Sequence, residues 1–148
     1  ANIFDNLYFI GTKTAGVWAV NTSEGIIVID ANFHYSSKEL VLGLLNFGLD
    51  PNNIKYIVIT HAHEDHYGAL HDIWPKLKAP VWMTPFGAGL LEAKRQGEQG
   101  APKIPLTIYR AGEKFTVGPF EIEAIPVAHS IPAGSRMRAF AGTRRSVL

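Results

Sequence analysis

The segment Ile57–Leu70, IVITHAHEDHYGAL, gathers three histidines and two carboxylates into six positions directly after an apolar run. His61 and His63 are two residues apart, so in an extended backbone their side chains point to the same side and can share one cation. Asp65 and His66 follow as the chain turns into the next helix. They can face a second cation or orient the ligands of the first. The segment therefore predicts a metal site at the end of a strand.

The composition limits both the architecture and the ligands of such a site. With 148 residues, 47% of them hydrophobic and 18% charged, the chain is long enough for one domain with its own core. The formal net charge of +1 provides no broad cationic field for a nucleic acid or a membrane surface. The sequence contains no cysteine, so a metal must be bound by His, Asp or Glu. Zinc, iron and manganese all accept such ligands.

Apolar runs and turn residues divide the chain into short alternating elements. Strands are expected at residues 6–11, 16–22, 25–31, 55–60, 79–84, 106–110, 113–117 and 120–129. Helices are expected at residues 37–49 and 86–99, and a short helix that ends near Pro75 is expected within residues 67–77. Strands that alternate with helices indicate a layered α/β or α+β sandwich rather than a helical bundle or an all-β barrel.

The last sixteen residues, 133–148, differ from the rest of the chain. They carry four arginines and no acidic residue, and they show no clear period of a strand or a helix. We expect an irregular arginine-rich tail rather than a functional basic arm. The predicted organisation is a metal-binding domain over residues 1–132 followed by this tail.

Four further polar residues near the histidine cluster need an interpretation. His71 lies one turn farther along the expected helix and is predicted to face solvent, as is Glu64 within the cluster. His34 follows a predicted strand, in a loop where sites commonly form, but a single histidine decides little. Ser130 is no nucleophile candidate, because the sequence supports no Ser-His-Asp arrangement around it.

The stretch THAHEDHYGAL resembles the His-x-His-x-Asp-His signature of the metallo-β-lactamase superfamily, whose hydrolases use one or two zinc ions. Residues 4–33 are similar to the opening strands of that family, including the strand-end Asp30. Residues 112–132 are similar to the segment that supplies its next metal ligand, here His129. The opening is more similar to the third subclass of metallo-β-lactamases, whereas HEDH and VAHSIP are more similar to the ribonuclease J branch.

The resemblance implies a fold and a set of metal ligands. The family fold is an α+β αββα sandwich, and this chain resembles its first half, a mixed sheet with helices on one face. The family roles place His61, His63 and His129 around a first metal, with an open position where bound water becomes hydroxide. They place Asp65 and His66 on a second metal, and Asp65 can also orient the attacking water and carry its proton.

The sequence departs from the family pattern after His129. Family members add a bridging Asp or Cys and a final His, but no Asp, Glu, Cys or His follows His129 here. We therefore expect one firmly bound zinc per chain and an incomplete second site, with iron or manganese as alternatives. A half-sandwich would also leave an apolar sheet face uncovered, which predicts a homodimer or a second half-domain as partner.

Three functions follow as hypotheses. The first is a metal-dependent hydrolase in which metal-activated hydroxide attacks an ester, amide or lactam of a small-molecule substrate, with weak activity because ligands are absent. The second is a metallo-nuclease that acts on RNA, and the third is a non-catalytic, metal-stabilised half-domain or fragment.

The sequence also bears on location. No apolar run approaches the roughly 20 residues of a membrane span. Residues 1–11 lack the basic start and apolar core of a secretory signal. We expect a cytoplasmic protein without membrane contact, or a periplasmic or secreted one if a signal preceded Ala1.

Overall fold

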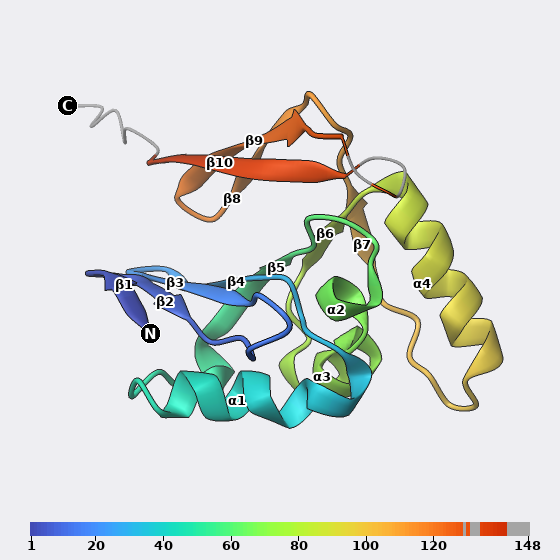
Figure 1. The fold of residues 1–148 in the computed structure, drawn as a ribbon, viewed down its shortest axis with the longest axis horizontal. Helices are drawn as coiled ribbons and strands as arrows, with labels where there is room; N and C mark the ends of the chain where they lie inside the picture. Colours follow the sequence, from blue (N-terminus) through green and yellow to red (C-terminus); the bar gives the residue numbers. More distant parts are fainter. Residues whose placement is uncertain (129, 131–133, 142–148) are drawn as a thin grey trace.

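The computed structural model describes residues 1–128, 130 and 134–141, which form helices and two sheets in three layers (Figure 1). The large sheet contains β1 (Asn2–Phe4), β2 (Leu7–Phe9), β3 (Trp18–Thr22), β4 (Gly25–Ile29), β5 (Ile54–Val58), β6 (Val81–Met83) and β7 (Leu106–Ile108). The small sheet contains β8 (Lys114–Val117), β9 (Phe120–Pro126) and β10 (Ser135–Ala141). The helices are α1 (Ser37–Leu45), α2 (Glu64–Tyr67), α3 (Leu70–Leu77) and α4 (Pro85–Gly97), with 3₁₀ turns at His34–Ser36 and Pro51–Asn53.

The seven strands of the large sheet lie in sequence order, and the pairing between neighbours changes from antiparallel to parallel at β4. Strands β1 to β4 pair antiparallel, whereas β4, β5, β6 and β7 pair parallel. Parallel neighbours need crossover connections, and these are α1, the α2–α3 pair and α4. The carboxyl ends of β4 and β5 therefore lie side by side, at the point where the histidine segment begins.

Strand β4 is buried on both faces, which accounts for its continuous apolar sequence. Val28 packs with Leu40 and Leu44 of α1 in the core between the helices and the large sheet. Its neighbour Ile27 points to the opposite face, because side chains alternate along a strand. There it packs with Ile122 of β9 in a second core between the two sheets.

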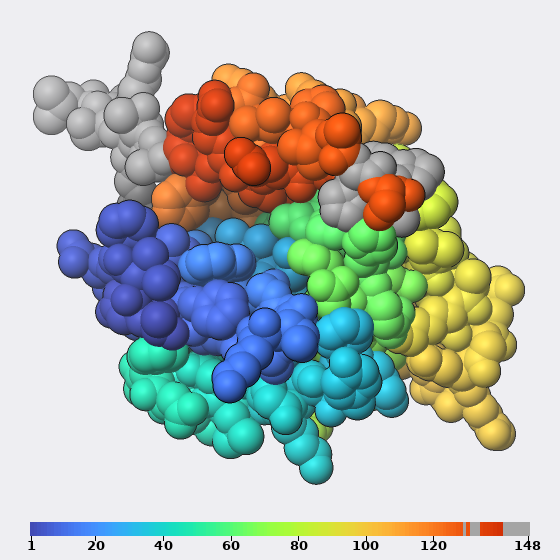
Figure 2. Space-filling view, viewed as in Figure 1, coloured from blue at the N-terminus to red at the C-terminus, as the bar shows by residue number. Residues whose placement is uncertain are grey.

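The small sheet corrects one expectation about the architecture. The predicted fold class is confirmed as a mixed sheet with α1, α2 and α3 on one face (Figure 1). The other face was expected to be uncovered, but the small sheet lies over its centre (Figure 2). Its outward side carries the ion pairs Lys114–Glu121 (3.4 Å) and Arg138–Glu123 (3.5 Å). The uncovered apolar face thus no longer argues for a homodimer, which stays a prediction.

The irregular tail predicted from residue 133 is wrong for the segment Ser135–Ala141. This segment is β10, antiparallel to β9, with Met137 opposite Ala124 and Ala139 opposite Ile122. The neighbouring strand β9 supplies partners for its backbone N–H and C=O groups. Backbone pairing therefore makes this segment a strand, although its side chains show no alternating pattern in the sequence. Residues 142–148 lie outside the described residues.

The end of one helix and the presence of one strand also differ from prediction. Helix α3 continues past Pro75 to Leu77 and ends where Lys78 adopts φ 52°, with Lys78 N donating to Trp74 O at 2.8 Å. Strand β1 was not predicted, and it pairs with β2 at the edge of the large sheet. Within the described part of the chain, no helix is long and apolar enough to cross a membrane.

Tyr109, just after β7, is fully enclosed and supports the strand end that leads into the histidine segment. Its hydroxyl donates to Ile59 O at 2.6 Å and lies 3.2 Å from Thr60 O. Burial raises the pKa of Tyr109, so the phenol stays protonated and keeps donating. Loss of the hydroxyl leaves these buried carbonyl oxygens without that donor.

We therefore expect Tyr109→Phe to lower the free energy of unfolding by about 1 to 2 kcal/mol in urea denaturation. Tyr35→Phe is the matched control, because the Tyr35 side chain is exposed, and it is expected to change stability by less than about 0.5 kcal/mol. Equal stability of the two variants would contradict this role of the Tyr109 hydroxyl.

Candidate metal centre

Asp30, directly after β4, connects three elements around the histidine segment. Its Oδ1 accepts from Thr60 N at 2.8 Å, and its Oδ2 is 2.7 Å from His66 Nδ1. The Thr60 hydroxyl lies 3.0 Å from Oδ1 and 2.9 Å from Oδ2. Asp30 also adopts φ 66°, a left-handed conformation that is uncommon outside glycine and that Asp tolerates better than most residues. One buried carboxylate thus links the ends of β4 and β5 to α2.

Three histidines lie close together beside Asp30. The ring centroids of His61 and His66 are 3.8 Å apart, and those of His61 and His63 are 5.0 Å apart. Asp65 Oδ2 lies 3.3 Å from His66 Nε2. The structure therefore brings together the four ligands that the segment was predicted to supply. His129, the fifth predicted ligand, lies outside the described residues.

Polar contacts are made by both ring nitrogens of His66 and by one ring nitrogen each of His61 and His63. Both ring nitrogens of His66 face carboxylates, His61 Nδ1 lies 2.9 Å from Thr60 Oγ1, and His63 Nε2 lies 3.1 Å from Ser130 Oγ. Among the described residues, no three His, Asp or Glu side chains surround one point as metal ligands. The donor set nevertheless fits a borderline divalent cation in kind, since it offers imidazole nitrogen and carboxylate oxygen. Its ligand roles stay predictions.

The electrostatics of the site centre on the Asp30–His66 pair. Burial raises the pKa of Asp30, and this outweighs the opposing effect of its hydrogen bonds from His66 and Thr60. Burial alone would lower the pKa of His66, but the hydrogen bond to Asp30 and the charges of Asp30 and Asp65 outweigh it, so the pKa of His66 is raised. His66 thus faces Asp30 through Nδ1 at 2.7 Å and Asp65 through Nε2 at 3.3 Å.

The backbone fixes α2 against the loop that follows β4. Ala31 N donates to His66 O at 2.7 Å, and Ala69 N donates to Asn32 O at 2.9 Å. Asn32 is fully buried and, like Asp30, has a positive φ, here 71°. These contacts set the orientation in which α2 presents His66.

The other polar residues take places that the sequence did not reveal. His71 was predicted to face solvent, but it is buried and its Nδ1 lies 2.9 Å from Glu98 Oε2, because the end of α4 covers α3. His34 pairs with Asp72 at 2.7 Å and does not join the cluster. Thr60 is a site residue that sequence reasoning missed, and its position directly after a predicted strand was the available signal.

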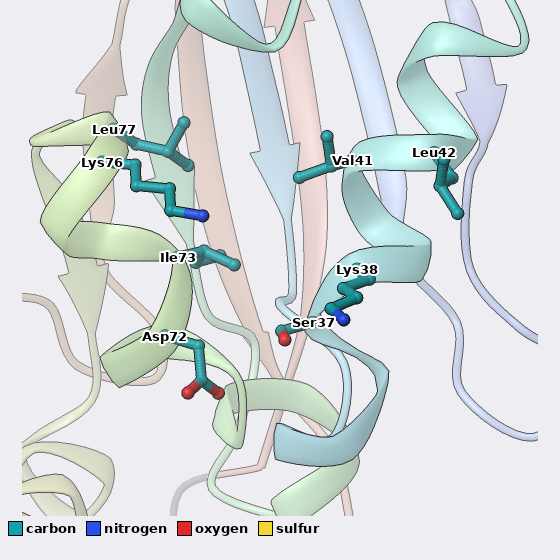
Figure 3. Close-up of a pocket in the computed structure, with 8 residues that line it drawn as sticks. All are labelled: Ser37, Lys38, Val41, Leu42, Asp72, Ile73, Lys76 and Leu77. Atoms are coloured by element: carbon teal, nitrogen blue, oxygen red, sulfur yellow. The ribbon is translucent and has the colours of Figure 1, made fainter.

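A pocket lies between the two sheets beside this cluster. It has a volume of about 610 Å³, and Asp30, Thr60 and His61 line one side while Arg136 lines the other. A second pocket, of about 290 Å³, lies between α1 and α3, where Val41 faces Ile73 (Figure 3). The second pocket contains none of the predicted ligands, so the first is the candidate substrate pocket.

The family model described as the metallo-beta-lactamase superfamily matches residues 15–135. The chain belongs to this superfamily. This match confirms the resemblance predicted from the His-x-His-x-Asp-His segment.

The similar proteins include ribonucleases J, and the similar solved structures include metallo-beta-lactamases. The chain is 59% identical over 80 residues to a ribonuclease J of Sinorhizobium meliloti, covering 54% of this chain and 14% of the relative. It is 32% identical over 137 residues to a ribonuclease J of Helicobacter pylori, covering 82% of this chain and 19% of the relative. The structure of the Rm3 metallo-beta-lactamase matches with a TM-score of 0.78 at 24% identity, covering 97% of this chain and 56% of that one. BJP-1, a subclass B3 metallo-beta-lactamase of Bradyrhizobium japonicum, matches with a TM-score of 0.76 at 24% identity, covering 93% and 55%.

The similar structures and the similar sequences support different conclusions about this chain. The two solved structures show a shared fold. This chain spans less than a fifth of the length of these two ribonucleases J. The similarity therefore concerns only a part of each of these relatives.

The Asp30–His66 pair predicts a pH dependence for the metal-free chain. A raised histidine pKa stabilises the fold at low pH, so the contribution of His66 is complete below its ordinary pKa of 6.5 and is lost as the pH rises through its folded value. We expect NMR titration to give a His66 pKa above 6.5, and Asp30→Asn to lower it. Asp72→Asn, which alters the separate His34 pair, should leave it unchanged, and a wild-type His66 that titrates at or below 6.5 would contradict the pairing.

Proposed function

We propose that this chain is the metal-binding part of a metal-dependent nuclease that cleaves RNA. The observation that carries the proposal is the convergence of His61, His63, Asp65 and His66 at the end of β5, in a chain similar to ribonucleases J. The likeness to metallo-beta-lactamases supports the fold alone, so hydrolysis of an ester, amide or lactam has less support than cleavage of RNA.

The chain's own residues have distinct roles in this proposal. His61, His63 and His129 would hold the first cation, and Asp65 with His66 a second. A divalent cation in such a site supplies hydroxide near neutral pH by lowering the pKa of bound water. Asp65 accepts the proton of the attacking water.

Two residues outside the ligand set orient the histidines. Asp30 holds His66 through Nδ1, and Thr60 contacts His61 through Nδ1 at 2.9 Å. Hydrogen bonds to the far nitrogen of a ligating imidazole fix its tautomer and ring orientation. Trp18 and Arg136 are among the residues that line the neighbouring pocket, and these residue types commonly contact bases and phosphates.

The 148 residues carry only part of the ligand set that the family resemblance implies. The family's bridging Asp and final His have no counterpart after His129. We accordingly expect one firmly bound metal and slow turnover from the 148-residue chain.

Metal retention tests the ligand assignment. We expect the wild-type chain to retain about one equivalent of zinc after dialysis, and His61→Ala with His63→Ala to retain almost none, because two imidazoles are lost. Saturating zinc should raise the unfolding free energy of the wild type by about 2.7 kcal/mol at a hundred times the dissociation constant. His34→Ala is the control, since His34 pairs with Asp72 outside the cluster. Elemental analysis that finds two retained equivalents, or none, contradicts the assignment.

Substrate choice is tested by salt dependence. We expect single-stranded RNA to bind with an affinity that falls as salt rises, because phosphate neutralisation releases counterions. Cleavage of labelled RNA should require the metal and stop with a chelator. Turnover of a chromogenic lactam, together with RNA binding that is absent or insensitive to salt, would instead favour the small-molecule hydrolase.

A further inference from the structure

We propose that Lys94 of α4 is a positioning residue that holds the α2 turn, and with it Asp65 and His66, in the orientation needed for metal binding. Only the metal-binding part of this inference rests on the proposed function. The positioning of the turn is a property of the chain itself and can be measured without metal.

The contacts of Lys94 enclose the two predicted ligands. Its Nζ donates to Glu64 Oε1, and it also donates to Gly68 O at 3.1 Å. Glu64 is the first residue of α2 and Gly68 is its C-cap. Asp65 and His66 lie between these two residues, so one ammonium group restrains the turn at both ends.

The burial of Lys94 distinguishes it from an ordinary surface lysine. Its side chain is 17% exposed, whereas that of Glu64 is 48% exposed. The Tyr67 ring of α2 lies 5.6 Å from Nζ, a distance at which a cation and a ring attract. A largely buried ammonium group needs partners, and all three partners found here belong to the same turn.

The turn is otherwise held from the opposite side. The bonds from Ala31 N to His66 O and from Ala69 N to Asn32 O attach it to the loop after β4. At Gly68 an added Cβ would lie 2.5 Å from Glu64 O, so the close approach at this end of the turn requires glycine. Loss of Lys94 would therefore leave the turn attached on one side only.

Lys94 is largely buried, whereas Glu64 is half-exposed. Loss of their ion pair should therefore change the position of the α2 turn more than the global stability of the fold. After Lys94→Met, the half-exposed Glu64 carboxylate can be hydrated again, so no unpaired charge stays buried. The methionine also retains most of the apolar stem. The variant should therefore fold normally while the α2 turn opens more often.

Hydrogen exchange of the metal-free chain tests the positioning. We expect Lys94→Met to raise amide exchange across residues 64–69 by about tenfold, the effect of losing bonds to a charged group, with little change in α1. Arg95→Met is the matched control, because Arg95 is the next residue of α4 and pairs with Glu92 of the same helix. Equal exchange in Lys94→Met and wild type overturns the proposal, as does an equal rise in Arg95→Met.

Metal affinity provides the second measurement, by competition with a chromophoric chelator. Lys94→Met should bind zinc about tenfold more weakly or worse, as is common when a residue that orients ligands is removed. Glu64→Gln should show a smaller loss, because Lys94 keeps its contacts with Gly68 O and the Tyr67 ring, and the double variant should lose little more than Lys94→Met alone. Unchanged affinity despite faster exchange overturns the link between the turn and the metal. A wild-type chain that binds no zinc contradicts the proposed function instead, and the exchange measurement then decides the role of Lys94.

Discussion

The carboxylate of Asp30 is the contact on which the geometry of the histidine cluster depends. Its two oxygens receive bonds from Thr60 and His66, so the ends of two parallel strands and the following turn share one buried acceptor. A carboxylate at this depth is stable only when it is hydrogen-bonded, and here Thr60, just after β5, and His66 of α2 supply the donors. Parallel pairing of β4 with β5 places Thr60 next to Asp30.

The two sheets contribute different parts of the site. The large sheet and α2 carry His61, His63, Asp65 and His66, and the chain after β9 brings Ser130 to His63. The core between the sheets, formed by Ile27, Val58, Val117 and Ile122, therefore does more than exclude water. It sets the distance between the histidine segment and the residues that follow β9.

The local sequence predicted the position of the histidine segment at a strand end, but it did not predict contacts between residues far apart in the chain. Period-two spacing placed His61 and His63 on one side of a strand end, because that information lies within three residues. The contacts of His71 with Glu98 and of Lys94 with Glu64 join residues 27 and 30 positions apart, and no local pattern encodes such partners. Strand β10 was missed for a related reason, since its regularity comes from pairing with β9.

The left-handed backbone at Asp30 and Asn32 has a consequence for mutational tolerance. Two positive φ angles flank the fully buried Ala31, so β-branched side chains are strained at both positions and a larger side chain at residue 31 has no space. In a saturation library, position 32 would accept glycine or aspartate, which adopt this backbone readily. Position 30 would be more restrictive, because glycine satisfies the backbone but removes the acceptor for Thr60 and His66. Comparing the residues accepted at these two neighbouring positions would thus separate the conformational demand of the loop from the chemical demand of the site.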